Sequence, residues 1–102
     1  MTIARFLDLG TRYITATDAA LLDQRSTDGG STCLIIRRHD YGWFIHVPLE
    51  PAELATLAVA LRANGYSNAF VGVLSYASKH ECWWVNLDAD GEDETDLPTF
   101  DW

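Results

Sequence analysis

Long apolar runs, an export signal and a disulfide framework are all missing from this chain. No stretch approaches the roughly 18 apolar residues of a membrane-spanning helix, so we expect no membrane partner. Residues 1–9 hold one Arg, one Asp and no apolar run typical of a signal peptide, which predicts a cytoplasmic protein. In that reducing compartment the only two cysteines, Cys33 and Cys82, are expected to be buried free thiols.

Basic residues are absent from the last quarter of the chain. All seven Lys and Arg residues lie within residues 1–79, where seven acidic residues balance them. Residues 80–102 hold eight acids and therefore carry the whole formal net charge of −8. Such a segment repels a phosphate backbone, which argues against direct binding of DNA or RNA. A basic protein surface would instead be attracted and steered toward it.

The remaining composition is that of an ordinary globular protein. The chain has 102 residues, of which 48% are hydrophobic, with four Trp, four Tyr and four Phe. This length fits one domain, and we expect residues 1–102 to form a single α+β domain with an acidic C-terminal segment at 81–102. A chain of this size buries roughly 60–70% of its unfolded surface, which suffices for a core without a metal or a disulfide.

The first half of the chain predicts strands around one short helix. A strand is expected somewhere within residues 2–14, and Thr15 with Asp18 forms a capping-box variant that opens a helix at 16–24. Ile14, Ala19 and Leu22 are expected to face the core. Two further strands, at 32–38 and 43–47, form an antiparallel hairpin around the turn at Asp40-Tyr41-Gly42.

The second half predicts two amphipathic helices and a final strand. Pro51 opens a helix at 51–64, Asn64-Gly65 closes it, and Ser67 caps another helix at 67–80. Both carry apolar stripes with i, i+3, i+4, i+7 spacing: Leu54, Leu57, Ala58 and Leu61, then Phe70, Val73, Leu74 and Ala77. With a strand at 82–87, the order β-α-β-β-α-α-β predicts an α+β fold with an antiparallel or mixed sheet of about four strands and helices on one face.

No pattern in the chain matches a complete active site or cofactor site. The acidic run from Asp88 has Gly91 fourth and Thr99 twelfth, so it fails as an EF-hand loop. The three histidines and two cysteines lack zinc-ligand spacing. Both cysteines lie inside predicted strands with apolar neighbours, which favours inert buried thiols over nucleophiles. Gly29-Gly30 lacks the Lys-Ser/Thr of a phosphate loop. We therefore expect no cofactor, no metal and no enzymatic activity.

Histidines, arginines and tryptophans have alternative interpretations. His39 is predicted to be a solvated turn residue, whereas His46 points to the sheet face opposite to Ile45 and Val47. Arg37 and Arg38 alternate between faces, so they cannot form one basic patch. Trp83 and Trp84 are adjacent, so one can be core while the other needs a covering helix or a partner. Phe100 and Trp102 either contribute to an interface or staple the tail to the domain.

Two segments carry a resemblance to a known group of proteins. They are Tyr13-Ile-Thr15-Ala-Thr-Asp18-Ala-Ala-Leu-Leu22 and the ending formed by Trp84-Val-Asn-Leu-Asp88-Ala-Asp90-Gly91 with Leu97-Pro98-Thr99-Phe100-Asp101-Trp102. Together they resemble short uncharacterised acidic proteins of bacterial plasmids, phages and integrative elements. The resemblance implies a mobile-element setting and assigns no activity.

The leading functional hypothesis is a non-enzymatic interaction protein. In a mobile-element setting, its carboxylates would stand in for phosphates and block a host nucleic-acid-binding defence complex, as an anti-CRISPR does; the partner would be a CRISPR effector or another complex with a basic surface. The alternative is an accessory or regulatory protein that binds another element-encoded protein, followed by a small hydrolase or metal enzyme. The predicted partner-binding residues are Asp88, Asp90, Glu92, Asp93, Glu94, Asp96, Asp101 and Trp102.

Overall fold

The computed structural model describes residues 6–27, 35–48, 50–89, 91 and 97–100. Along the chain lie β1 (Phe6–Gly10), the 3-10 turn η1 (Thr11–Tyr13), α1 (Ala16–Thr27), β2 (Ile36–His39), β3 (Gly42–His46), α2 (Pro51–Ala63), α3 (Asn68–Lys79) and β4 (Trp84–Asp88). The predicted order β-α-β-β-α-α-β is confirmed. The first helix is three residues longer than predicted, and the last strand begins at Trp84 instead of Cys82.

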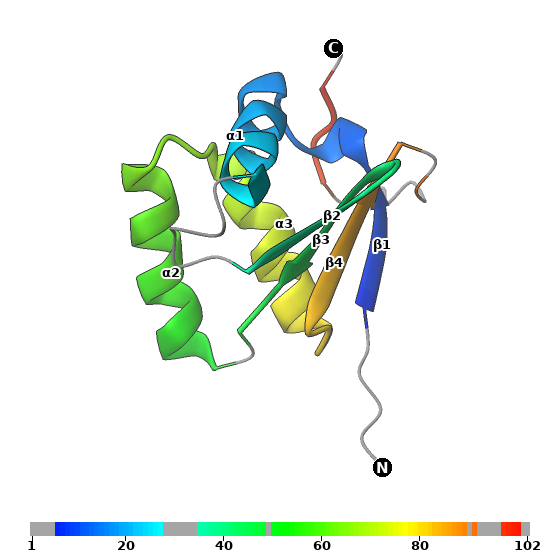
Figure 1. Ribbon diagram of the computed structural model, residues 1–102. Coiled ribbons are helices and arrows are strands. Elements are labelled where there is room, and N and C mark those ends of the chain that lie inside the picture. Colours follow the sequence, from blue (N-terminus) through cyan, green and yellow to red (C-terminus); the bar gives the residue numbers. More distant parts are fainter. Residues whose placement is uncertain (1–5, 28–34, 49, 90, 92–96, 101–102) are drawn as a thin grey trace.

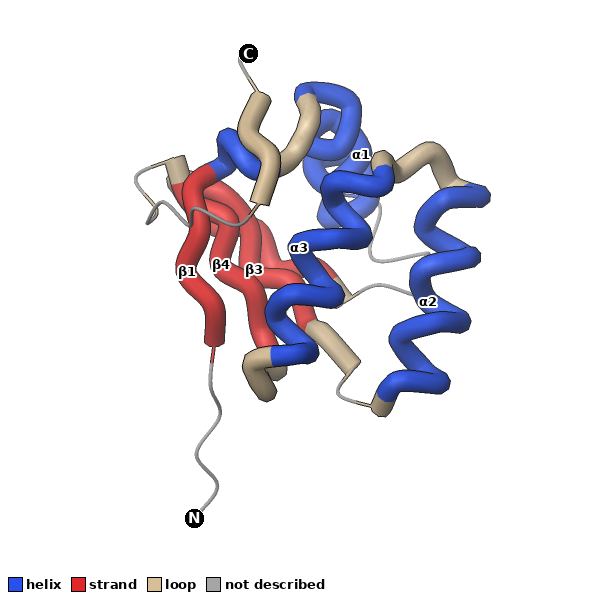
Figure 2. Tube along the Cα trace, turned by 180° about the vertical axis from the view of Figure 1, so that it is seen from behind, coloured by secondary structure: helices blue, strands red, loops and turns tan. Residues whose placement is uncertain are grey.

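The strands form one mixed sheet in the order β1-β4-β3-β2. β4 comes last in the sequence and inserts into the middle, where it pairs parallel to β1 and antiparallel to β3. The hairpin of β2 and β3 supplies the remaining antiparallel pair. All three helices lie on the same side of the sheet, as the views from front and back agree (Figures 1 and 2). Within the part of the chain that the structure describes, helices therefore cover one face of the sheet only.

The core lies between this covered face and the helices. The sheet contributes alternate residues to it, including Leu9, Ile45, Val85 and Leu87, each at most 1% exposed. The predicted helical stripes are confirmed, because Leu57 and Leu61 of α2 are buried and Leu54 and Ala58 pack against them. From α3, the buried members are Phe70, Val71, Val73, Leu74 and Ala77.

Helix caps explain where the helices begin and end. The Thr15 hydroxyl accepts a hydrogen bond from the Asp18 amide, and the Asp18 carboxylate accepts one from the Thr15 amide, so the predicted capping box is present. Ser67 caps α3 by accepting from the Phe70 amide at 3.1 Å. At the end of α2, Gly65 has a φ of 95°, a conformation that glycine adopts without strain.

Asp18 also joins two helices that are distant in the sequence. It is fully buried and accepts hydrogen bonds from the Ser67 amide at 2.8 Å and the Ser67 hydroxyl at 2.5 Å. The sequence predicted only the local cap. The contact links the N-terminus of α1 to the N-terminus of α3, where a carboxylate also complements both helix dipoles.

Candidate functional site

The predicted partner-binding residues fall mostly outside the described residues. Asp88 is the exception and ends β4. The other members of the set lie outside the described residues: Asp90, Glu92, Asp93, Glu94, Asp96, Asp101 and Trp102. Their neighbours in the sequence are described, however, and these neighbours fix where the acidic stretch leaves the domain and where it returns.

The acidic stretch leaves the domain beside β1. The Gly91 amide donates to the Asp88 carbonyl at 2.9 Å, which makes a tight turn after β4. Gly91 also lies so close to β1 that a Cβ atom on it would collide with the carbonyl of Leu9 and the amide of Gly10. Only glycine fits between the two backbones without a shift, so this residue fixes the chain to the end of the sheet.

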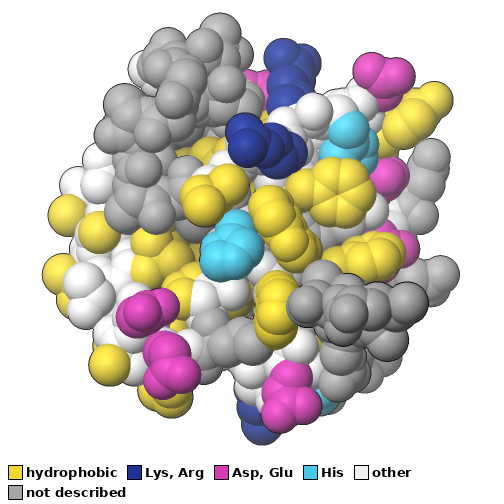
Figure 3. All heavy atoms as spheres, turned by 60° about the horizontal axis from the view of Figure 1, so that its bottom comes forward, with side chains coloured by type: hydrophobic (Ala, Val, Ile, Leu, Met, Phe, Trp, Pro, Cys, Tyr) yellow, Lys and Arg dark blue, Asp and Glu magenta, His cyan; other side chains and the backbone are white. Residues whose placement is uncertain are grey.

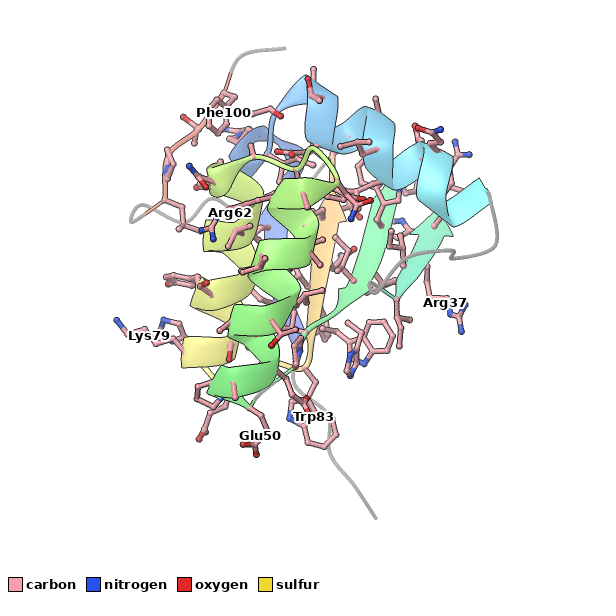
Figure 4. The ribbon with its side chains drawn as sticks, turned by 90° about the vertical axis from the view of Figure 1, so that its left-hand side faces the viewer. Arg37, Glu50, Arg62, Lys79, Trp83 and Phe100 are labelled. Atoms are coloured by element: carbon pink, nitrogen blue, oxygen red, sulfur yellow. The ribbon has the colours of Figure 1, made fainter. Side chains whose placement is uncertain are left out.

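The chain returns to the same end of the molecule. Leu97 packs against the core, and the Phe100 amide donates to the Arg12 carbonyl at 2.7 Å. Phe100 is half-buried and lines a small hollow of about 130 Å³ with Thr11, Arg12 and Ala89. In Figure 4, Phe100 and Trp83 lie at opposite ends of the molecule. Of the two alternatives predicted for Phe100, the structure shows the one in which it fixes the tail to the domain; Trp102 lies outside the described residues.

Acidic residues elsewhere do not extend this region. Glu81 belongs to the same acidic quarter of the sequence but precedes β4, whereas Asp88 ends it, so the strand separates the two. Glu81 has a φ of 60° and sits in the turn that ends α3. Asp23 accepts from the Trp43 indole at 3.1 Å and lies 3.6 Å from Arg38, which ties α1 to the sheet. Among the described residues, the acidic stretch therefore begins at Asp88.

The uncovered face of the sheet is rich in aromatic side chains. Strand register arranges its residues in three rows across β1, β4, β3 and β2. The rows are Gly10-Asp88-Gly42-His39, then Asp8-Asn86-Phe44-Arg37, then Phe6-Trp84-His46-Ile35. Phe6 is 58% exposed, Phe44 37% and Ile35 50%. Figure 3 shows hydrophobic side chains gathered around two histidines, with Lys and Arg side chains beside them. We call these three rows the open face.

Ring contacts organise the open face. The Phe6 and Phe44 rings meet edge to face at 6.3 Å between centroids, over the strand that separates them. His46 and Trp84 meet edge to face at 5.2 Å, and His39 lies against Phe44 at 5.0 Å. His46 thus points away from Ile45 and Val47, as predicted. The contacts form two groups, Phe6-Phe44-His39 and His46-Trp84, and strand register sets Trp84 next to Phe6.

A chain of hydrogen bonds crosses the same face. Asn86 donates to the Asp8 carboxylate at 3.0 Å and accepts from His39 Nε2 at 2.8 Å. His39 Nδ1 in turn accepts from the Tyr41 amide at 3.2 Å. The prediction that His39 is a solvated turn residue is wrong, because it ends β2 and its ring reaches across to β4. Both ring nitrogens are engaged, so neither is available as a general base in this arrangement.

Neither Trp83 nor Trp84 is a core residue. Trp83 precedes β4 and is 36% exposed, while Trp84 begins the strand on the open face and is half-buried. The prediction that one of them packs in the core is wrong, because Val85 and Leu87 occupy the core side of β4. Arg37 and Arg38 do alternate: Arg37 shares the row of Phe44, and Arg38 turns toward Asp23.

The described residues provide little else for chemistry. Within residues 6–27, 35–48, 50–89, 91 and 97–100, no group of three His, Cys, Asp or Glu side chains could hold a metal ion. Cys82 is a buried free thiol, as predicted, whereas Cys33 lies outside the described residues.

A groove of about 510 Å³ separates the hairpin from α2, and Ile35, His46, Pro48, Glu53 and Leu57 are among its mainly apolar lining residues. Among the described helices, none is long and apolar enough to cross a membrane.

Sequence reasoning missed the open face as a site. The sequence does contain a signal for this face, because Phe44 and His46 alternate along the strand with the core residues Trp43, Ile45 and Val47. The pairing of β1 with β4 had no local signal.

Comparison with known proteins places the chain in a family. The model of a family of unknown function, the DUF5983 C-terminal domain, matches residues 6–102. No curated protein and no solved structure matches the chain.

Proposed function

The chain belongs to the DUF5983 C-terminal domain family, and we propose that it is a non-enzymatic interaction domain whose acidic end binds a basic protein surface. The acidic end consists of Asp88 and the stretch from residue 90 to 96, together with the tail that follows it. Its partner would carry a surface that normally holds nucleic acid, because such surfaces are the commonest strongly basic ones.

The distribution of charge supports a specific surface. Residues 1–79 are neutral as a whole, and residues 80–102 carry the net charge of −8. Carboxylates that are crowded together repel one another and lower the stability of the fold, so folding does not explain their concentration. The alternative is that the charge only maintains solubility, which does not require it to be gathered in one part of the chain.

The observation that carries the proposal is the double attachment of the acidic stretch. Gly91 is wedged against β1, while Leu97 packs on the core and Phe100 bonds to Arg12. The acidic residues follow one attachment point in the sequence and precede the other, so both ends of the stretch are fixed to the domain. A surface that is attached at both ends loses less conformational entropy on binding than a free tail does.

In its narrowest form, the proposal is that this acidic end imitates a phosphate backbone and blocks a host nucleic-acid-binding defence complex. The resemblance to proteins of plasmids, phages and integrative elements supports this form, because inhibition of host defence is a common task of small acidic proteins on such elements. A second candidate is an accessory protein whose partner is encoded by the same element.

Three forms of the protein test the proposal as baits in a host lysate. The first is the wild type; the second has Asp90, Glu92, Asp93 and Glu94 changed to Asn or Gln. The control removes three exposed acids that lie away from the acidic end: Glu50, Glu53 and Glu81. We expect the wild type and the control to recover the same nucleic-acid-binding complex, and the second form to lose it. Added duplex DNA or RNA should displace the complex.

Equal recovery by all three forms would overturn the proposal, since neither the number of carboxylates nor their place in the chain would then affect binding. Recovery of an element-encoded protein instead of a nucleic-acid-binding complex would select the accessory role. Circular dichroism of each form controls for loss of folding.

A further inference from the structure

The open face has the residue pattern of a self-complementary surface, and we propose that it binds a second copy of this chain. The two copies would pack their open faces together around a two-fold axis that runs parallel to the strands. This interface shares only Asp88 with the proposed acidic end, so the two inferences can be tested separately.

The first ground is the exposed aromatic character of the face. The described helices all cover the other side of the sheet, and they leave Phe6, Phe44 and Ile35 between 37% and 58% exposed. An apolar surface of linked rings at the centre of a sheet is typical of a contact region. Sheets that pack face to face keep their strands nearly aligned at a separation of about 10 Å, which rings and long side chains fill.

The second ground is the charge at the two ends of the middle row. Asp8 on β1 begins this row and Arg37 on β2 ends it, with Asn86 and Phe44 between them. Both charged residues belong to edge strands, about 14 Å apart at the usual strand spacing. Arg37 projects away from the body of the molecule at the edge of the sheet (Figure 4). The face is thus acidic at one edge and basic at the other.

A two-fold axis parallel to the strands brings these opposite charges together. The axis keeps each row at its own level and reverses its direction, so β1 of one copy faces β2 of the other. Asp8 then meets Arg37 of the second copy, and the symmetry makes this pair twice. In the lower row, Phe6 meets Ile35 and Trp84 meets His46. The upper row brings Asp88 opposite Gly42, which has no side chain to obstruct the approach.

A two-fold axis that runs across the strands would bring like charges together instead. An axis across the strands would set β1 on β1 and β2 on β2. Asp8 would approach Asp8, and Arg37 would approach Arg37, so like charges would repel at both ends of the row. The charge pattern therefore selects one of the two symmetric arrangements, and this choice can be tested.

The size of the face predicts a weak dimer. Four strands and three rows cover about 400 Å² of flat area per copy at standard strand spacings. A standard interface takes about 800 Å² per partner. We therefore expect a dissociation constant on the order of 100 µM, so that the dimer is absent in dilute solution and prevails near 1 mM.

Sedimentation equilibrium between about 10 µM and about 1 mM protein measures this association. The decisive variants are Asp8→Arg and Arg37→Asp, each of which places like charges at both symmetric contacts. Each should raise the dissociation constant at least about tenfold. An equimolar mixture of the two should form a heterodimer with nearly wild-type affinity, because every contact then joins opposite charges. The double variant Asp8→Arg/Arg37→Asp should self-associate like the wild type.

The aromatic part of the face has its own matched pair of variants. Phe6→Ser removes an exposed ring from the open face and should weaken the dimer, whereas Val59→Ser removes an exposed apolar side chain from α2 and should not. A wild-type protein that remains monomeric at about 1 mM would overturn the proposal. So would a dimer whose affinity is indifferent to both charge reversals, or a mixture that fails to restore association. The variant neutralised at Asp90, Glu92, Asp93 and Glu94 should dimerise like the wild type, which separates this test from that of the acidic end.

Discussion

Asp18 is the most deeply buried charged residue that the structure describes. Its carboxylate accepts hydrogen bonds from the Thr15 amide at 3.0 Å, the Ser67 amide at 2.8 Å and the Ser67 hydroxyl at 2.5 Å. A buried carboxylate is tolerated only when donors surround it, and here the donors come from two helix N-termini. The residue therefore stabilises a tertiary contact and is not a site of chemistry.

Replacing Asp18 with alanine should destabilise the fold strongly. The change leaves the amides of Thr15 and Ser67 buried without this acceptor, so we expect a loss of about 2–4 kcal/mol in the free energy of unfolding. Urea denaturation measures it. Asp40→Ala, in the exposed hairpin turn, is the matched control and should change stability by less than about 0.5 kcal/mol. Comparable losses in the two variants would contradict the assigned role.

The hydrogen bonds of His39 predict which ring nitrogen carries the proton. Asn86 is oriented by its bond to Asp8, so its oxygen faces His39 and requires a proton on Nε2. Nδ1 accepts from the Tyr41 amide and must be bare. Nitrogen chemical shifts of the ring should thus report the neutral Nε2–H tautomer, and Asp8→Ala should leave the ring more mobile. A ring protonated on Nδ1 alone would show that the hydrogen-bond chain is assigned in the wrong direction.

The long-range roles of Asp18 and His39 were beyond sequence reasoning. The cap between Thr15 and Asp18 spans three residues and has a local pattern, whereas the bond to Ser67 spans 49. Asn86 bonds to Asp8 across 78 residues, and only the placement of β4 beside β1 brings them together. No periodicity in one segment records which distant segment lies next to it.

At the scale of elements, α2 and α3 were the most predictable parts. Their apolar stripes have the helical period, and Pro51, Gly65 and Ser67 mark their ends by known backbone preferences. Strands were harder, because their bounds depend on the partner strand. Trp84 and Phe44 look like core residues by composition, but the register turns both to the open face.

Alanine substitutions at two glycines test how closely the strands and helices pack. A Cβ atom on Gly42 would collide with the Leu87 carbonyl of β4, so Gly42→Ala must push β3 away and should cost about 1–3 kcal/mol. Gly72 lies inside α3 with no atom within 4 Å of the added Cβ. Gly72→Ala should therefore stabilise the protein by about 0.5–1 kcal/mol, since alanine restricts the unfolded chain. Thermal or urea denaturation measures the change in the free energy of unfolding for both variants. A change of the same sign in both would contradict this packing.

At the scale of the whole molecule, charge and apolar surface occupy different places. The acidic stretch leaves and returns at the end of the sheet near Gly10 and Arg12, whereas the exposed rings spread over the open face. Sequence alone located the charge, because counting acids needs no fold. It could not show that Gly91 and Phe100, which flank most of the acidic stretch, contact the domain, since both contacts are tertiary.

The most direct measurement of the central claim is affinity against ionic strength for the purified partner. It compares the wild type, the form neutralised at Asp90, Glu92, Asp93 and Glu94, and the control neutralised at Glu50, Glu53 and Glu81. If the acidic end binds a basic surface, the wild type and the control should weaken steeply with salt, mainly through slower association. The first neutralised form should bind weakly at every salt concentration, with a shallow slope. Equal affinities and equal slopes for all three forms would contradict the claim and leave the acidic stretch as a solubility device.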